Sequence, residues 1–167
     1  SEVISSANYA YDYQGYTSAT KAFDGDLTEP TNNNNTGPYY AYYGYMGDYM
    51  YVNDGYITQN FDDGKKVVTK YRMYPYVGDD RSHDPKSFHL KASHTGNFNE
   101  WIDLDHQTNQ SFTKGEWNEY EVSNEIGYQY YMLYLEANNG GSYMIVQEVE
   151  LIGYAFEVEP TPTSANF

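Results

Sequence analysis

The stretch KAFDGDLTEPTNNNNTG, residues 21–37, concentrates side chains that can bind a metal ion. Two aspartates flank a glycine, a glutamate and threonines follow, and four asparagines stand in a row. All of these residues offer oxygen ligands, and Leu27 is the one large aliphatic side chain that follows the aspartates. The stretch is therefore either a solvated acidic surface loop or part of a metal site.

A second segment, DDRSHDP at residues 79–85, places Asp, Arg, Ser and His together and invites a catalytic interpretation. Neighbours in sequence do not form a catalytic triad, which needs a buried carboxylate to orient the His and an oxyanion hole. The chain also lacks a nucleophile elbow, an HExxH helix motif and a phosphate-binding glycine loop. We therefore expect no catalytic residues, and we interpret the segment as an exposed turn or a recognition loop.

The elements that position these segments are predicted to be short strands, because apolar and polar residues alternate with a period of two. The alternating segments are 66–74, 87–93, 100–105, 118–123, 128–137 and 144–154. Turn sequences such as DDGK, HTGN and NNGG separate them. Strands at this spacing predict an all-β fold, either an antiparallel sandwich or a barrel. The Asn-, Tyr- and Gly-rich region 32–56 has no stable pattern and is predicted to be a long loop.

The alternation also predicts the core. Trp101 is expected to anchor the core behind its strand, while Glu148 and Glu150 are expected to face outward. The predicted inward-facing residues are Val67, Tyr71, Met73, Phe88, Leu90, Ala92, Ile102, Leu104, Tyr120, Val122, Tyr131, Leu133, Leu135, Val149 and Leu151.

The composition is acidic and rich in tyrosine: 22 of the 167 residues are Tyr, and the formal net charge is -15. High net charge with few aliphatic residues favours disorder, but each aromatic ring can bury ~150–250 Å², which permits a folded core built on tyrosine. The charge argues against nucleic acid as a partner, because phosphate binding requires Lys and Arg. No apolar run approaches the ~20 residues of a membrane-spanning helix, so we expect no membrane insertion.

The order of several motifs resembles the discoidin-like family, which includes the coagulation-factor C-type domains and the family 32 carbohydrate-binding modules. The motifs are AFDGD, YITQNF, KVVTKYRMYP, SFHLKAS, the strand and turn YQYYMLYLEANNGGSY, and the closing EVELIG. The resemblance implies a galactose-binding-like β-sandwich, a jelly roll that binds sugar through loops at one end. We expect one such domain over residues 1–156, followed by a Pro/Thr linker over 157–167.

For the stretch at 21–37, the resemblance implies a structural calcium ion. Calcium takes six to eight oxygen ligands, carboxylates mixed with carbonyls. Carried over from the family, Asp24 and Glu148 would give carboxylates, Lys21 and Asp26 would give backbone carbonyls, and Gln147 would give a carbonyl. The remaining ligand is predicted to be Thr36, with Thr28 and Asn35 as alternatives.

For the loop end, the resemblance implies a sugar site. Arg81 and His83 follow the strand where galactose-binding members place an arginine, and a guanidinium can donate two parallel hydrogen bonds to adjacent hydroxyls. Tyr143 stands where the family often places an aromatic that stacks on a sugar, and Asn138 and Asn139 lie in the same turn. Each has an alternative interpretation: the first two as solvated turn residues, the asparagines as turn formers and Tyr143 as a packing residue.

Tyr39, or its neighbour Tyr40, falls where some family lectins use a His, which this chain lacks. Together these residues predict a non-catalytic carbohydrate-binding module of a secreted or cell-surface protein, tethered to further domains. The alternative is a protein-binding or adhesion domain that uses a tyrosine-rich face, because one fold can serve several ligands.

Overall fold

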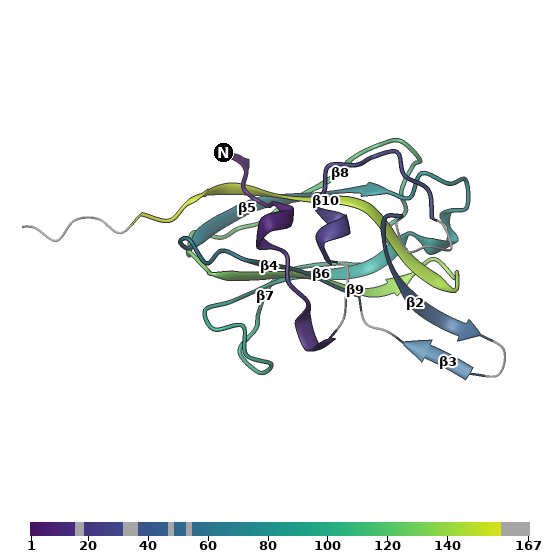
Figure 1. Ribbon diagram of the computed structural model, residues 1–167, viewed down its shortest axis with the longest axis horizontal. Helices are drawn as coiled ribbons and strands as arrows, with labels where there is room; N and C mark the ends of the chain where they lie inside the picture. Colours follow the sequence, from purple (N-terminus) through teal and green to yellow (C-terminus); the bar gives the residue numbers. More distant parts are fainter. Residues whose placement is uncertain (16–18, 32–36, 47–48, 53–54, 158–167) are drawn as a thin grey trace, which may run out of the picture.

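The computed structural model describes residues 1–15, 19–31, 37–46, 49–52 and 55–157, with side chains described outside 44–54. Among these residues, strands form two antiparallel sheets that pack as a β-sandwich (Figure 1). The predicted all-β sandwich is thereby confirmed. No helix in the described part of the chain is long and apolar enough to cross a membrane.

One sheet has the strand order β3-β2-β10-β5-β8, with β1 pairing with β10. Its strands are β1 (Glu2–Val3), β2 (Tyr39–Met46), β3 (Tyr49–Val52), β5 (Lys66–Pro75), β8 (Asn118–Glu121) and β10 (Tyr143–Ala155). The other sheet has the order β4-β9-β6-β7. It contains β4 (Gly55–Asn60), β6 (Pro85–Ser93), β7 (Ile102–Gln107) and β9 (Tyr130–Asn138). Four 3-10 turns join them: η1 (Ala7–Tyr9), η2 (Tyr13–Gly15), η3 (Ala19–Ala22) and η4 (Arg81–His83).

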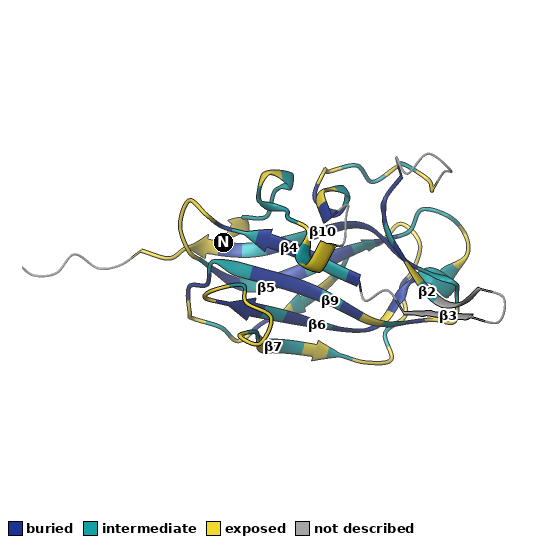
Figure 2. Ribbon diagram, turned by 60° about the horizontal axis from the view of Figure 1, so that its bottom comes forward, coloured by how far each residue is buried: buried dark blue, intermediate teal, exposed yellow. Residues whose placement is uncertain are grey.

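The core lies between the sheets and follows the predicted alternation, so that buried residues run along the central strands (Figure 2). Tyrosine contributes to this core because its hydroxyl finds partners there. The Tyr131 hydroxyl donates 2.7 Å to the Lys66 carbonyl and accepts from the Val68 N–H at 3.2 Å. The Tyr71 hydroxyl donates 2.6 Å to Asp105 Oδ2 and so links the two sheets. Both rings are fully buried.

Two predictions for the first half and the core were wrong. The region 32–56 is not a long loop, since β2 and β3 form a hairpin that projects from one end of the sandwich (Figure 1). Ile102 does not enter the core: it begins the edge strand β7 and is 46% exposed. The predicted linker lies, apart from Glu157, outside the described residues.

The sheet register brings the loops of interest to one end of the sandwich. Pro75, the last residue of β5, pairs with Val146 near the start of β10. The β5–β6 connection, which contains η4, therefore lies beside the turn between β9 and β10. This is the end from which the β2–β3 hairpin projects, because Tyr143 pairs with Tyr42.

Candidate functional site

The candidate site is built from η4 and the β9–β10 turn, which backbone hydrogen bonds join. The Asn139 N–H donates 3.2 Å to the Asp84 carbonyl, and the Gly141 N–H donates 2.9 Å to the Ser82 carbonyl. Asp80 caps η4, because its Oδ1 accepts the Ser82 N–H at 2.9 Å. Two loops that are remote in sequence are thereby held as one unit.

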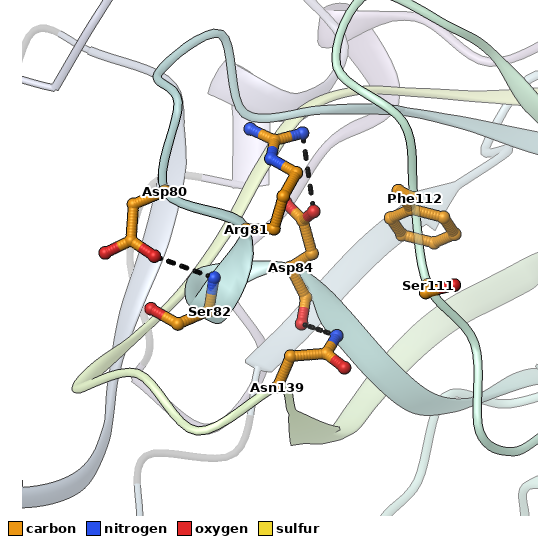
Figure 3. A pocket seen from close by; sticks show the side chains of 7 residues that line it. All are labelled: Asp80, Arg81, Ser82, Asp84, Ser111, Phe112 and Asn139. Atoms are coloured by element: carbon orange, nitrogen blue, oxygen red, sulfur yellow. Dashed lines mark hydrogen bonds and ion pairs between the residues drawn. The ribbon is translucent and has the colours of Figure 1, made fainter.

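An open pocket of about 430 Å³ lies against this unit (Figure 3). Residues from η4, from the β9–β10 turn and from the loop before β8 share its lining. They are Asp80, Arg81, Ser82, Asp84, Ser111, Phe112 and Asn139. The pocket therefore has mostly polar walls with one aromatic ring.

Arg81 and Asp84 form a charge pair in this pocket. Arg81 Nη1 lies 3.4 Å from Asp84 Oδ2, and the Asp84 side chain is 1% exposed. Arg81 Nη2 donates to the carbonyls of Tyr76 and Gly78, which fixes the guanidinium on its own loop. Burial raises the pKa of the Asp84 carboxyl to about 7, and the neighbouring Arg81 charge opposes this rise.

The pair is only partly satisfied within the described part of the chain. Both carboxylate oxygens of Asp84, and Nε and Nη1 of Arg81, are buried without a hydrogen-bond partner there. Buried polar atoms without partners are costly, each by ~1–3 kcal/mol. A ligand that carries both hydroxyl donors and acceptors could satisfy them.

His83 belongs to an aromatic cluster rather than to the pocket lining. Its ring lies 5.6 Å from that of Tyr143 and 6.5 Å from that of Tyr76, measured between centroids. Tyr143 in turn lies 5.5 Å from Tyr42 and 6.2 Å from Tyr40. The short turn η4 therefore places Arg81 in the pocket and His83 in a tyrosine cluster.

The two asparagines predicted for the site have different environments. Asn138 is 8% exposed, and its amide donates 2.7 Å to the carbonyls of both Gly141 and Tyr143. Its side chain thus holds the turn, as the alternative interpretation proposed. Asn139 is exposed and lines the pocket, with Nδ2 donating 3.0 Å to the Asp84 carbonyl.

Tyr39 does not fit the sugar-contacting role predicted for it. It is 3% exposed and belongs to the hydrophobic core, so its ring faces are covered by other side chains. The next tyrosines along β2 lie nearer the surface: Tyr40 is partly buried and Tyr42 is 39% exposed. The structure therefore replaces Tyr39 with Tyr40 and Tyr42 as the surface aromatics of this strand.

Two of the residues predicted to bind calcium, Asp24 and Glu148, lie close to each other. The Gly25 N–H donates 2.9 Å to Glu148 Oε2, which joins the loop after η3 to the closing strand. Glu148 is 6% exposed although it faces away from the core. Burial raises the pKa of Glu148 to about 8. The hydrogen bond from Gly25 lowers this pKa, and the nearby Asp24 carboxylate raises it further. The buried Glu148 carboxylate thus lies close to the exposed Asp24 carboxylate.

This arrangement contains oxygens that a cation would satisfy. Glu148 Oε1 and Gln147 Oε1 are buried without a hydrogen-bond partner in the described part of the chain. Gln147 Nε2 donates 2.8 Å to the Glu29 carbonyl, so the amide is oriented by the loop. Carboxylate and amide oxygens are the ligands that calcium prefers. These oxygens are of the kinds that calcium takes as ligands. Among them is the side-chain oxygen of Gln147.

The remaining predicted ligands lie in or near this loop. Lys21 belongs to η3, which packs against β10. Asp26 folds the loop, since its Oδ1 accepts the N–H and hydroxyl of Thr28 at 2.8 Å, leaving its carbonyl as the predicted donor. Thr36 and its alternative Asn35 lie outside the described residues.

A second hollow, of about 280 Å³, lies on the outer face of the four-stranded sheet. Trp101 lines it instead of anchoring the core, and the Trp101 ring contacts that of Tyr13 at 5.7 Å. Lys91 lies 5.4 Å from the Tyr134 ring at the same place. The full lining is Tyr13, Tyr56, Lys91, Phe98, Trp101, Met132 and Tyr134.

Sequence reasoning missed Asp84 and Tyr42, and it named Tyr40 only as the alternative to Tyr39. Asp84 stands in a run of charged residues that is typical of an exposed turn, yet it is buried and shares its pocket with the distant residues Ser111 and Phe112. Tyr40 and Tyr42 could have been found from the period of two along 39–42, which directs alternate tyrosines to opposite faces.

Solved structures of carbohydrate-binding modules have a similar fold. A family 32 module from a Clostridium perfringens family 31 glycoside hydrolase gives a TM-score of 0.60 at 16% identity, covering 91% of this chain and 90% of that chain. A second C. perfringens family 32 module, solved in complex with GalNAc-β-1,3-galactose, gives 0.57 at 14% identity, covering 87% and 91%. The F5/8 type C domain of a Bacteroides fragilis protein gives 0.60 at 12% identity, covering 89% and 97%.

No protein-family model matches the chain, and no curated protein matches its sequence. The similarity at these identities establishes the fold, and it confirms the architecture implied by the motifs from AFDGD to EVELIG.

Proposed function

We propose that this chain, which has the discoidin-like β-sandwich fold of the family 32 carbohydrate-binding modules, is itself a non-catalytic carbohydrate-binding module. The observation that carries the proposal is the Arg81–Asp84 pair: both residues line an open pocket at the loop end, and buried polar atoms of both lack hydrogen-bond partners within the described chain. The similar structures add support, since one of them was solved with a bound disaccharide.

The chemistry of the pocket suits vicinal hydroxyls. A hydroxyl can donate to an Asp84 oxygen while it or its neighbour accepts from Arg81, and hydrogen bonds to charged groups are the stronger ones. Asn139 and Ser111 add neutral polar groups at the rim, and Phe112 offers an apolar surface, although it is 7% exposed. The pocket volume of about 430 Å³ suits one or two sugar units.

The tyrosine cluster beside η4 would extend the binding surface. A sugar ring has an apolar face that packs on aromatic rings, and Tyr42 is 39% exposed. His83 links the two regions because it shares η4 with Arg81 and contacts Tyr143. A longer glycan could therefore place one unit in the pocket and the next against Tyr42 and Tyr143.

A calcium ion bound by Asp24, Glu148 and the neighbouring oxygens would stabilise this end of the sandwich. Bound calcium would supply positive charge to the buried Glu148 carboxylate and the exposed Asp24 carboxylate, and it would join the loop after η3 to β10. The ion fits an extracellular setting, where modules bind calcium with dissociation constants of ~10⁻⁴–10⁻³ M. In that setting, tethering to other domains would raise the effective concentration of the attached protein at its glycan.

The test is a glycan-array screen in calcium, followed by calorimetry of the best glycan with variants. Asn139→Ala and Asp84→Asn should each weaken binding at least about tenfold, because a hydrogen bond to a charged or pocket-lining group is lost. Asp62→Asn, a change of the same type in an exposed turn, is the matched control. An array without binding to any glycan would contradict the proposal.

Phe98→Ala locates the site independently, because Phe98 is 73% exposed and lines the hollow on the four-stranded sheet. Loss of glycan binding in Phe98→Ala, with Asn139→Ala unchanged, would move the sugar site from the loop end to that sheet face.

A protein-binding role is the second candidate, and the tyrosine cluster of Tyr40, Tyr42 and Tyr143 is the observation that favours it. Exposed tyrosines supply large contact areas at low entropic cost. Binding of a protein partner that Tyr42→Ala abolishes and Asp84→Asn leaves intact would support this alternative.

A further inference from the structure

Two histidines and a glutamate come together on the outer face of the four-stranded sheet, away from the loop-end site. His89 on β6 pairs directly with His106 on β7, and their rings stack with centroids 3.8 Å apart. Glu136 on β9 reaches both rings: its Oε2 lies 3.2 Å from His89 Nε2 and its Oε1 lies 3.7 Å from His106 Nε2. The three side chains offer ligand atoms that all lie within 4.8 Å of one another.

We propose that His89, His106 and Glu136 bind a zinc ion or a similar divalent transition-metal ion. Two imidazole nitrogens and one carboxylate oxygen form a known type of zinc ligand set, with a fourth position left to water. Zinc bonds of about 2.0–2.1 Å place tetrahedral ligand atoms about 3.3–3.4 Å apart. His89 Nε2 lies 3.2 Å from Glu136 Oε2 and His106 Nε2 lies 3.7 Å from Glu136 Oε1, so each nitrogen has one oxygen of this carboxylate near that distance.

Two further residues hold the ligands in the orientation that metal binding needs. Asp103 accepts from His89 Nδ1 at 2.9 and 3.0 Å, which leaves Nε2 as the atom that faces Glu136. Ser87 donates 2.7 Å to Glu136 Oε1 and so orients that carboxylate. Partners of this kind fix the tautomer of a ligating histidine and the position of a ligating carboxylate.

Carboxylates face both nitrogens of His89, as they would face the two N–H groups of an imidazolium. A metal ion at Nε2 takes the place of the second proton. Binding requires the stacked rings to open, because a shared ion must lie in the plane of each ring. His106 can turn, since its side chain is 43% exposed and it lies on the edge strand β7.

The proposed site differs in chemistry and place from the calcium site. Imidazole nitrogen suits zinc, copper and nickel, whereas calcium takes oxygen ligands only. The experiment is therefore calorimetric titration of the chelator-treated full chain with zinc chloride in saturating calcium. Cobalt(II) in place of zinc gives a visible absorption band that reports a tetrahedral nitrogen and oxygen site.

We expect one zinc per chain. His106→Ala and Glu136→Gln should each weaken zinc binding at least about tenfold, and Asp103→Asn should weaken it about 10–100-fold. The side chains changed in these variants, those of His106, Glu136 and Asp103, are each more than 40% exposed. We therefore expect the variants to fold, and thermal melting checks this. His94→Ala is the matched control, because His94 is exposed and lies outside the cluster.

No zinc binding up to about 1 mM, or equal affinity in the wild type and His106→Ala, would overturn the proposal. Loss of affinity in His94→Ala alone would also overturn it, because zinc would then occupy another site. Glycan binding is measured separately in calcium, so failure of either proposal leaves the other intact.

Discussion

Gly25 and Glu148 are joined by a 2.9 Å hydrogen bond that closes the loop after η3 onto the last strand. Glu148 Oε2 accepts this bond, whereas its Oε1 is buried without a hydrogen-bond partner among the described residues. The bond therefore satisfies half of a carboxylate that also lies close to Asp24. A bound cation is the simplest means of compensating both charges.

The first prediction concerns Glu148→Gln. In wild-type protein, calcium at about 100 times its dissociation constant should add ~2.7 kcal/mol of stability, which raises Tm by roughly 5–10 °C. Glu148→Gln should lose most of this rise, because a carboxylate ligand is removed. Without calcium the variant should be at least as stable as wild type, because burial penalises ionisation of the Glu148 carboxyl and the neutral amide does not carry this cost.

Thermal melting with calcium and with chelator measures both effects. Glu121→Gln, on the exposed strand β8, is the matched control and should respond to calcium as the wild type does. An equal calcium-dependent rise in Tm in Glu148→Gln and wild type would contradict the proposal that Glu148 binds calcium.

The second prediction concerns the pH dependence that Asp84 creates. Its pKa is raised from an ordinary value of 3.8 to about 7 by burial, so the folded state binds a proton more tightly than the unfolded state. Between these two values the folded state carries more protons, and its stability must fall as pH rises. One pKa unit corresponds to ~1.4 kcal/mol, and we expect the free energy of unfolding to fall by about this amount as the pH rises.

Urea unfolding of the wild type and Asp84→Asn at pH 4.5 and pH 7 measures this contribution. The variant should show a smaller decline, because its amide does not titrate. Comparing the two proteins isolates Asp84 from Glu148, whose pKa burial raises to about 8. An equal fall in the free energy of unfolding between the two pH values in both proteins would contradict the raised pKa of Asp84.

The strands were predictable where apolar and polar residues alternate, because one face of each sheet is buried. β5, β6 and β9 follow this pattern over part of their length, and Tyr131, Leu133 and Leu135 are buried as expected, whereas β10 is buried without a break over residues 144–149. The same rule failed for β2, although β2 also alternates. Tyr39 and Ala41 point into the core while Tyr40 and Tyr42 do not. Because tyrosine occupies both faces of β2, the sequence shows no alternation of apolar and polar residues there.

The site residues were predictable only as far as sequence position determines environment. Arg81 and His83 are two residues apart in η4, yet one lines the pocket and the other joins an aromatic cluster. Glu148 faces outward as predicted but is buried, because the loop that contains Gly25 covers it. Asp84 is buried among residues that are distant in sequence. Such environments arise from long-range packing, which local alternation does not encode.

The third prediction concerns Gly141, whose lack of a side chain lets His83 approach the β9–β10 turn. A Cβ atom at this position would lie 2.3 Å from His83 Nδ1 and 2.8 Å from Ser82 Oγ. Gly141→Ala should therefore displace the His83 ring and separate η4 from the turn. We expect glycan affinity to fall at least about tenfold, because the displaced ring would move the groups that position the ligand.

Global stability should fall less, since His83 lies at the surface end of the sandwich and its side chain is 18% exposed. Ser142→Ala is the control, because it changes the next residue while leaving the backbone bond from Tyr43 to the Ser142 carbonyl in place. Calorimetry with the best glycan, paired with urea unfolding, separates the two effects. If Gly141→Ala bound glycan as tightly as Ser142→Ala does, the contact between His83 and the turn would have no part in recognition, and the site would be confined to the Arg81–Asp84 pocket.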